Sequence, residues 1–94
     1  MIDELDSVLH QPVRTRIVAY LMAMNEVDFT TLKKTLGLTD GHMSTHMKIL
    51  IESQYVEMKK EFVQSKPRTT YQITAIGKNA FRQYLETLKK IVSL

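Results

Sequence analysis

The side chains best suited to binding chemistry gather between residues 39 and 53. At 100° per residue, Met43, Met47 and Leu50 form one apolar stripe of a helix. The opposite face is small or polar and carries one cation; its members are Gly41, His42, Ser44, Thr45 and Lys48. Small residues allow close approach and polar tips reach base edges, so this face suits the major groove of a DNA duplex. An ordinary solvated helix face is the alternative interpretation.

Two histidines four residues apart, His42 and His46, have a spacing that can place both imidazoles on one metal ion. His42 lies toward the polar face and His46 at the edge of the apolar one, and no third ligand is nearby. We therefore expect no metal cofactor, although a metal-responsive regulator that uses both residues and His10 remains an alternative. No carboxylate pair, nucleophile with a base or glycine-rich phosphate loop stands out, so we do not expect an enzyme.

Composition predicts a small globular protein. Ninety-four residues, 44% hydrophobic and 24% charged, suffice for one domain with a modest core. No apolar run approaches the roughly 20 residues that cross a bilayer, and the acidic start M-I-D-E-L-D is unlike a secretory signal. Because the chain also contains no cysteine, we expect a cytoplasmic protein without disulfides and without a membrane partner.

Charge is distributed unevenly along the chain. Residues 1–30 sum to −3, residues 31–60 to +2 and residues 61–94 to +4. Such a chain can turn a basic face toward a polyanion while its amino-terminal part stays away. The asymmetry agrees with a nucleic-acid partner, but asymmetry of this size is common in soluble domains.

The elements that must position the polar face are predicted from periodicity and capping signals. Apolar spacing predicts an amino-terminal helix over about residues 2–10, and Pro12 then begins a second helix that continues to about Met24. After a short extended segment, Thr30 is expected to cap a third helix that ends near Leu36. The inner face of the second helix is expected to hold Val13, Ile17, Leu21 and Met24.

A helix-turn-helix follows from the next signals. Gly37 can end the third helix, Thr39 can cap the next one, and Asp40 complements the positive end of that helix. The two helices that meet at residues 37–38 then have the arrangement in which the first braces the second across the DNA backbone.

Beyond this unit the apolar period changes from 3.6 to 2, which predicts a strand over about residues 56–63. We expect a polar hairpin tip at residues 64–70, with Lys66 and Arg68, and a returning strand over residues 71–74. A two-stranded hairpin is marginal alone, so part of it must pack on the helices. The residues expected to do so are Val56, Met58, Tyr71 and Ile73.

A last helix, from Ala75 to about Val92 after a Thr74 cap, carries more apolar surface than one small core requires. The amino-terminal helix has the same surplus, so we expect the two terminal helices, about 2–10 and 75–93, to form a symmetric dimer interface. The interface residues expected are Ile2, Leu5, Leu9, Tyr84, Leu85, Leu88, Ile91 and Val92. Packing of both helices within one chain is the alternative.

The run L-G-L-T-D-G-H-M-S-T-H-M-K-I-L, followed by Y-V-E and K-P-R-T-T-Y-Q-I-T-A-I-G-K, resembles the small winged-helix regulators related to the MarR and ArsR families. The resemblance covers nearly the whole chain, from about Leu9 to Leu88. It implies a mainly α fold with a small β-hairpin wing (α+β), a winged helix-turn-helix in the order α-α-β-α-α-β-β-α, as a single domain over residues 1–94. It further implies a homodimeric transcription regulator.

By this resemblance, residues 39–53 form the recognition helix for the major groove, and the basic wing at residues 64–70 meets the DNA backbone or minor groove. The residues expected to contact DNA are Lys33, Thr39, Asp40, Gly41, His42, Ser44, Thr45, Lys48, Lys66, Arg68 and Thr69. Gln54 stands where many relatives have glycine, so the helix must end in another way or accept a left-handed residue. Neither the cysteines of ArsR-type metal sensors nor the long terminal helices of MarR-type relatives are evident, which leaves an unknown small-molecule effector open.

The sequence therefore predicts a sequence-specific regulator of transcription that binds double-stranded DNA as a homodimer. Two other functions remain as alternatives: a winged-helix module that binds protein within a larger assembly, and a regulator that responds to metal through histidine.

Overall fold

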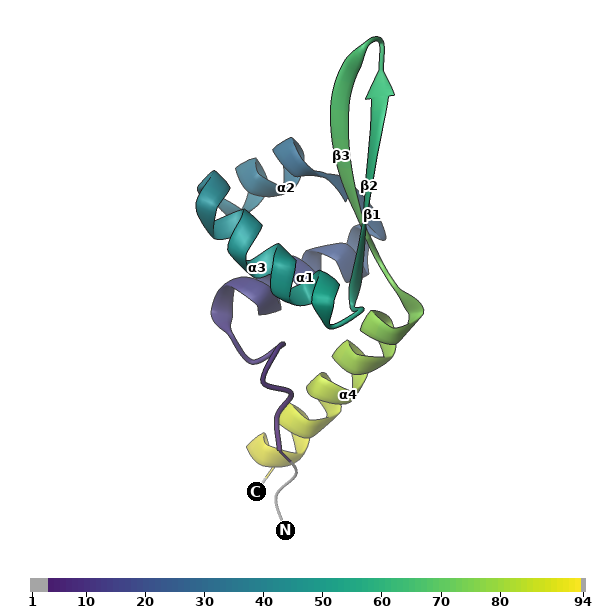
Figure 1. The fold of residues 1–94 in the computed structure, drawn as a ribbon. Helices are drawn as coiled ribbons and strands as arrows, with labels where there is room; N and C mark the ends of the chain where they lie inside the picture. Colours follow the sequence, from purple (N-terminus) through teal and green to yellow (C-terminus); the bar gives the residue numbers. More distant parts are fainter. Residues whose placement is uncertain (1–3, 94) are drawn as a thin grey trace.

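The computed structural model describes residues 4–93, which form four helices and one three-stranded antiparallel sheet (Figure 1). The elements in chain order are α1 (Pro12–Met24), β1 (Glu26–Asp28), α2 (Phe29–Leu36), α3 (Asp40–Glu52), β2 (Val56–Val63), β3 (Lys66–Ile73) and α4 (Ala75–Val92). This is the predicted winged helix-turn-helix order from α1 onward, with the short strand β1 added to the hairpin sheet. No helix within residues 4–93 is long and apolar enough to cross a membrane.

The amino-terminal segment departs from prediction, because residues 4–10 form an irregular chain and a turn instead of a helix. Asp6 explains the turn: its Oδ1 accepts the backbone N–H groups of Val8 (2.8 Å) and Leu9 (3.2 Å). Its Oδ2 accepts the Tyr55 hydroxyl at 2.5 Å. A carboxylate that satisfies nearby backbone donors gives the chain an alternative to a helix. Ile2 and the rest of residues 1–3 lie outside the described part.

α1 begins as predicted and ends at its last apolar residue. Pro12 occupies the first helical position, and the Gln11 side chain accepts the Arg14 N–H to cap the helix. Met24, predicted to face the core, is 53% exposed. It is the final residue of the helix, before Asn25 turns the chain with a φ of 69°, and it lines an open hollow beside β1 instead of the core.

α2 begins two residues earlier than predicted because its cap is Asp28 and not Thr30. The Asp28 carboxylate accepts the backbone N–H of Thr31 at 3.1 Å and its hydroxyl at 2.7 Å. A negative side chain at this position also complements the positive end of the helix. Gly37, with a φ of 65°, ends α2 in the left-handed conformation, as the sequence predicts.

α3 has the predicted cap and nearly the predicted length. The Thr39 hydroxyl accepts the His42 N–H at 3.2 Å, and the helix ends at Glu52. Gln54 then adopts a φ of 66°, so the chain accepts a left-handed non-glycine residue after the helix. Such a residue costs about 1–2 kcal/mol.

The hairpin is longer and its turn shorter than predicted. β2 and β3 pair in register from Val56 opposite Ile73 to Val63 opposite Lys66, which leaves only Gln64 and Ser65 as the connection. Both turn residues have positive φ, 53° and 65°, as a two-residue type I′ turn requires. The predicted tip over residues 64–70 is therefore wrong from residue 66 onward, because that stretch belongs to β3.

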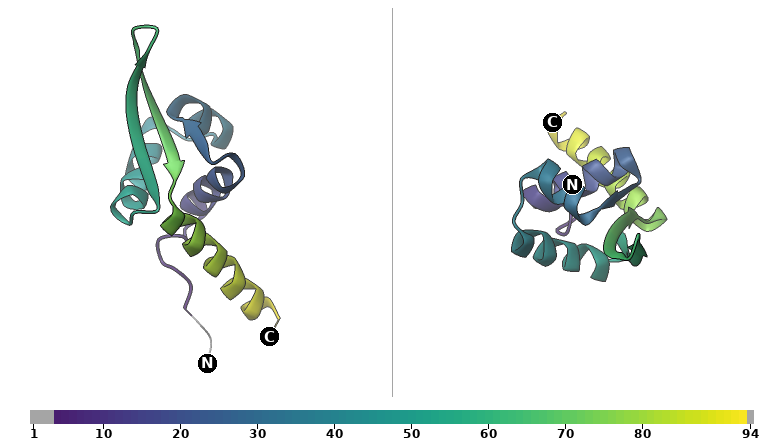
Figure 2. Two further views of the ribbon diagram at one scale, coloured as in Figure 1. Left: turned by 90° about the vertical axis from the view of Figure 1, so that its right-hand side faces the viewer. Right: turned by 90° about the horizontal axis from the view of Figure 1, so that it is seen from above.

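The outer half of the hairpin projects from the molecule as a wing. β3 is the central strand of the sheet, but β1 pairs only with its residues Thr70–Gln72. Figures 1 and 2 show the hairpin beyond this point standing clear of the helices. The chain accordingly measures 54 Å along its longest axis and 25 × 21 Å across it.

One apolar core lies between the helices and the inner face of the sheet. Its largest fully buried side chains are Leu9, Ile17, Leu21, Leu32, Met43, Met47 and Leu50, with Val18 and Val56. Tyr71 and Ile73 of β3 are buried as predicted, whereas Met58 is 45% exposed. Met58 lines an open groove between β2 and α3, where the two elements diverge.

α4 contributes part of its apolar stripe to this core. Phe81 and Tyr84 are buried, whereas Leu85 is 43% and Val92 83% exposed. The helix begins in close contact with Tyr55, the residue before β2, since a Cβ on Gly77 would lie 2.2 Å from the Tyr55 carbonyl oxygen.

Candidate nucleic-acid interface

The polar face of α3 is exposed and its apolar stripe is buried, as the spacing predicts. Met43, Met47 and Leu50 are at most 2% exposed and anchor the helix to the core. The exposed face consists of Gly41, His42, Ser44, Thr45 and Lys48. The helix is therefore fixed on one side and presents small and hydrogen-bonding groups on the other.

An ion pair joins the two helices of the helix-turn-helix. Lys33 Nζ on α2 lies 2.6 Å from Asp40 Oδ1 at the start of α3. The same ammonium lies 5.8 Å from the centre of the Phe29 ring. Both ends of the pair were predicted to contact DNA, and the structure brings them together. The pair also offsets the negative charge of Asp40 next to a face suited to phosphates.

A second polar connection supports α3 from its flank. The Arg14 guanidinium donates from Nη1 to His46 Nδ1 at 3.1 Å and from Nε to the Val8 carbonyl at 2.7 Å. Burial, followed by the charges of Arg14 and His42, lowers the pKa of His46 below its ordinary value. His46 is therefore held as a neutral acceptor and ties α3 to α1 and to the amino-terminal segment.

The three histidines do not converge. His42 is exposed on α3, His46 bonds to Arg14, and His10 Nδ1 lies 2.9 Å from the Tyr84 hydroxyl. Within residues 4–93, no three histidine or carboxylate side chains gather in a way that could hold a metal ion.

Arg68 and Lys66 are two residues apart in β3 and therefore share one face of the wing. Arg68 lies opposite Glu61, and its Nη2 is 3.7 Å from Asp28 Oδ1, on the side of β1. The Thr31 hydroxyl first, and the Arg68 charge after it, lower the pKa of Asp28. Lys66, by contrast, is exposed beside the turn. Arg68 thus lies along the strand and not at the flexible tip that the sequence suggests.

Lys60 and Phe62 also belong to the exposed surface of the wing, although their spacing predicts only that they lie in a strand. Lys60 pairs with Thr69 and Phe62 with Pro67 across the hairpin. Phe62 is 77% exposed. The signal available in the sequence was a cation and an aromatic residue, Lys60 and Phe62, on one face of the strand predicted over about residues 56–63.

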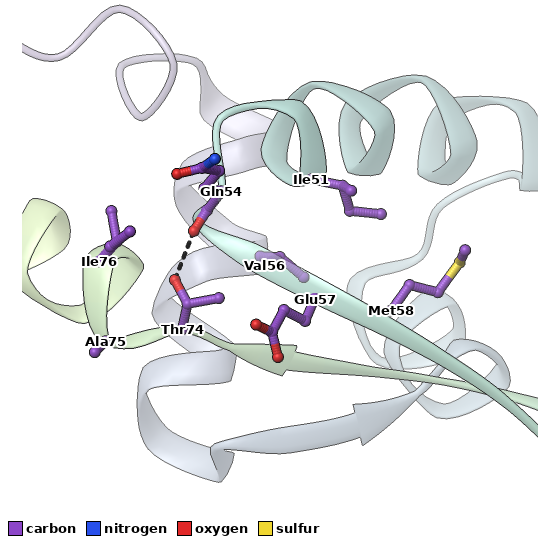
Figure 3. A pocket seen from close by; sticks show the side chains of 8 residues that line it. All are labelled: Ile51, Gln54, Val56, Glu57, Met58, Thr74, Ala75 and Ile76. Atoms are coloured by element: carbon purple, nitrogen blue, oxygen red, sulfur yellow. Dashed lines mark hydrogen bonds between the residues drawn. The ribbon is translucent and has the colours of Figure 1, made fainter.

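Two open hollows flank the carboxyl-terminal half of α3. The first, about 390 Å³, separates α3 from the wing and is lined by Ser44, Met47, Lys48, Ile51, Glu52, Met58 and Tyr71. The second, about 650 Å³, lies where α3, β2 and α4 meet (Figure 3) and is lined by Ile51, Gln54, Val56, Glu57, Met58, Thr74, Ala75 and Ile76. The Thr74 hydroxyl closes its edge by donating to the Gln54 carbonyl at 2.7 Å.

The residues expected at a dimer interface divide by burial. Leu9 and Tyr84 are buried within the single chain, and Leu85 and Val92 are exposed. Leu5, Leu88 and Ile91 are half-buried, whereas Ile2 lies outside the described residues.

Comparisons with known proteins agree with this geometry. The family model of winged helix DNA-binding domains matches residues 13–92. An uncharacterized protein of Methanocaldococcus jannaschii is 36% identical over 78 residues, which are 83% of this chain and 85% of that protein. The solved structure of a transcriptional regulator homologue from Pyrococcus horikoshii OT3 superposes with a TM-score of 0.86 at 29% identity, over 92% of this chain and 85% of that one. An ArsR family transcriptional regulator shares the fold alone, with a TM-score of 0.59 at 15% identity over 92% of this chain and 84% of that one.

Proposed function

Because this chain belongs to the family of winged helix DNA-binding domains, we propose that it is a sequence-specific transcriptional regulator that acts on double-stranded DNA as a homodimer. The observation that carries the proposal is the exposed face of α3. This face combines small residues, hydrogen-bonding side chains and one cation, and it adjoins a projecting wing that carries further cations.

In the proposed complex, α3 lies in the major groove. Gly41 allows close approach, and His42, Ser44 and Thr45 reach the base edges. Thr39 and Asp40, at the start of the helix, lie near the groove rim and orient its first turn. The remaining cations contact phosphates, which sets the register without reading the sequence.

The phosphate-binding cations differ in what they lose on binding. Lys48 and Lys66 are exposed and make no ion pair within residues 4–93. Lys33 and Arg68 are paired with aspartates in the free protein, so each must exchange a carboxylate for a phosphate. We therefore expect Lys48 and Lys66 to contribute more to affinity than the two paired cations. Thr69, half-buried opposite Lys60, supports the wing strand at the same surface.

Dimerisation is proposed from the apolar surface that a single chain leaves exposed on α4. Leu85 and Val92 lie on this helix with the half-buried Leu88 and Ile91, and the amino-terminal segment runs beside it (Figures 1 and 2). A two-fold axis through this surface would present two copies of α3 to half-sites about 10 base pairs apart.

The test is a fluorescence-anisotropy titration of labelled duplexes at several salt concentrations. We expect the wild-type protein to bind a genome-selected duplex more tightly than a random one and to lose affinity steeply with salt. Lys48→Ala should weaken binding to both duplexes and reduce the salt slope by about one, because one phosphate contact is lost. Thr45→Ala should weaken binding mainly to the selected duplex.

Lys89→Ala is the matched control, since this exposed cation lies on α4 away from α3. It should leave affinity and salt slope unchanged. Absence of any salt-sensitive binding by the wild-type protein at micromolar concentration would refute the proposal and favour a protein-binding module instead.

A further inference from the structure

The wing exposes an aromatic side chain that the core does not use. Phe62 is 77% exposed on β2, and its cross-strand partner is Pro67. Pairing of β1 with β3 stops at Thr70, so no strand covers this part of the hairpin within the described chain. Monomeric proteins often expose single apolar residues, so exposure alone does not indicate a function for Phe62. Its position on the wing does.

Strand alternation places Phe62 on the side of the wing that faces α3. Side chains two residues apart share a face, so Phe62 lies on the same face as Lys60 and Met58. Met58 lines the groove between the wing and α3, together with Lys48 of α3. Phe62 therefore belongs to a surface that begins at the exposed polar face of α3 and extends outward along the hairpin.

The surroundings of Phe62 are cationic. Lys60 precedes it on the same face, whereas Lys66, which pairs with Val63, is next to Pro67 in sequence but on the opposite face. Both ammonium groups are exposed. Arg68 and Glu61 point to the opposite face, toward Asp28, and do not neutralise this side. An exposed ring beside a cation matches a polyanion that offers apolar surface between rows of charge.

The DNA minor groove has this chemistry, because two phosphate rows border sugars and base edges. Apolar side chains that enter it partly unstack a base step, most easily at flexible pyrimidine–purine steps. Pro67 has a fixed φ and therefore limits the freedom that the wing loses on binding. Resting on the proposed function, we propose that Phe62, braced by Pro67, is an apolar wedge that enters the minor groove beside each half-site, with Lys60 of the same face on a bordering phosphate.

This assignment makes Phe62 a specificity-determining residue that senses how easily the flanking DNA deforms. It adds to the base readout by α3 without a hydrogen bond of its own. The two contributions can be separated, because loss of an apolar contact lowers affinity without releasing fewer counterions.

The experiment compares wild type, Phe62→Ala and Lys66→Ala on two duplexes that share the half-sites but differ in the flank, one with a TA step and one with a stiff A-tract. Anisotropy titrations at several salt concentrations give the affinity and the salt slope. Phe62→Ala should bind the TA duplex about tenfold more weakly, lose the preference for TA and keep the wild-type salt slope. Lys66→Ala should instead reduce the slope by about one on both duplexes.

Val63→Ala is the matched apolar control, since Val63 alternates to the other face of the same strand; it should bind both duplexes as wild type does. Salt-dependent binding by wild type together with unchanged binding by Phe62→Ala would overturn the wedge and leave the proposed function intact. Absence of binding by wild type would overturn both. Loss of dimers in sedimentation of Phe62→Ala would also overturn it, because Phe62 would then join two copies of the chain.

Discussion

Replacing Gly77 with alanine tests how tightly α4 is seated on the end of the helix-turn-helix. A Cβ at this position lies 2.2 Å from the Tyr55 carbonyl oxygen and 3.1 Å from Ile73 Cγ1, where ordinary contacts begin at 3.4 Å. The carbonyl cannot simply move aside, because it accepts the Thr74 N–H at 3.1 Å. The Thr74 hydroxyl, in turn, donates to the Gln54 carbonyl at 2.7 Å. The new methyl group must therefore push α4 outward.

The cost follows from the contacts that this shift disturbs. Overpacking against backbone costs about 1–3 kcal/mol, and each weakened hydrogen bond at Thr74 adds about 0.5–1.5 kcal/mol. The better helix propensity of alanine returns about 1 kcal/mol. We therefore expect the free energy of unfolding of Gly77→Ala to fall by about 2–3 kcal/mol.

Urea denaturation followed by circular dichroism, at equal protein concentrations, measures this difference. Gly41→Ala is the matched control, because no atom lies within 4 Å of a Cβ built there and the position is exposed in α3. That variant should be as stable as wild type or gain up to about 1 kcal/mol. If Gly77→Ala unfolds at the wild-type urea concentration, the inferred contact between α4 and Tyr55 is wrong.

Two further predictions concern protonation and the wing turn. The pKa of His46 is lowered in the folded protein, so the unfolded chain binds a proton at this residue more readily. The stability that His46 contributes is therefore fully present above its ordinary pKa of 6.5 and decreases as the pH falls from that value toward the lower pKa of the folded state. His46→Gln should therefore lose less unfolding free energy than wild type between about pH 7 and pH 5 in urea titrations; an identical pH dependence would count against the burial of His46, which is the main cause of its lowered pKa. Ser65 has a φ of 65°, so Ser65→Gly should stabilise the wing by about 1 kcal/mol, seen as a raised urea midpoint, whereas a lowered midpoint would contradict the turn assignment.

Local signals predicted the recognition helix well. The Thr39 cap and the stripe of Met43, Met47 and Leu50 act within a few residues, so α3 begins where expected and buries the expected face. The same holds for Thr74 at the start of α4, whose hydroxyl accepts the Gly77 N–H. The structure bears out these boundaries, while the contacts of this face with DNA stay predictions.

The failures occurred where distant residues decide the conformation. Residues 4–10 have the apolar spacing of a helix, but the Asp6 carboxylate binds Tyr55, 49 positions away, and holds a turn instead. The stretch around Pro67 has the composition of a loop, yet the register with β2 extends it as a strand. Proline is tolerated there because β1 does not reach that part of the sheet, which leaves it at an edge.

The position of Arg68 also depended on the register. The sequence placed this residue at a flexible tip, whereas a two-residue turn moves the tip outward and leaves Arg68 opposite Glu61. Asp28, which caps α2, is then its nearest carboxylate. No local pattern indicated that the cap of one helix would meet a cation of the hairpin.

The Arg14 guanidinium has a consequence for control of the protein. It donates to the Val8 carbonyl with one nitrogen and to His46 of α3 with another, so a single side chain joins the amino-terminal segment to the helix proposed to bind DNA. Under the proposed function, a molecule that pulled the segment around Val8 away from Arg14 would alter the support of α3, and linkage would require DNA on α3 to change the affinity of that molecule by the same factor. Binding at the amino-terminal segment would thus change the binding constant for DNA at α3, and the reverse.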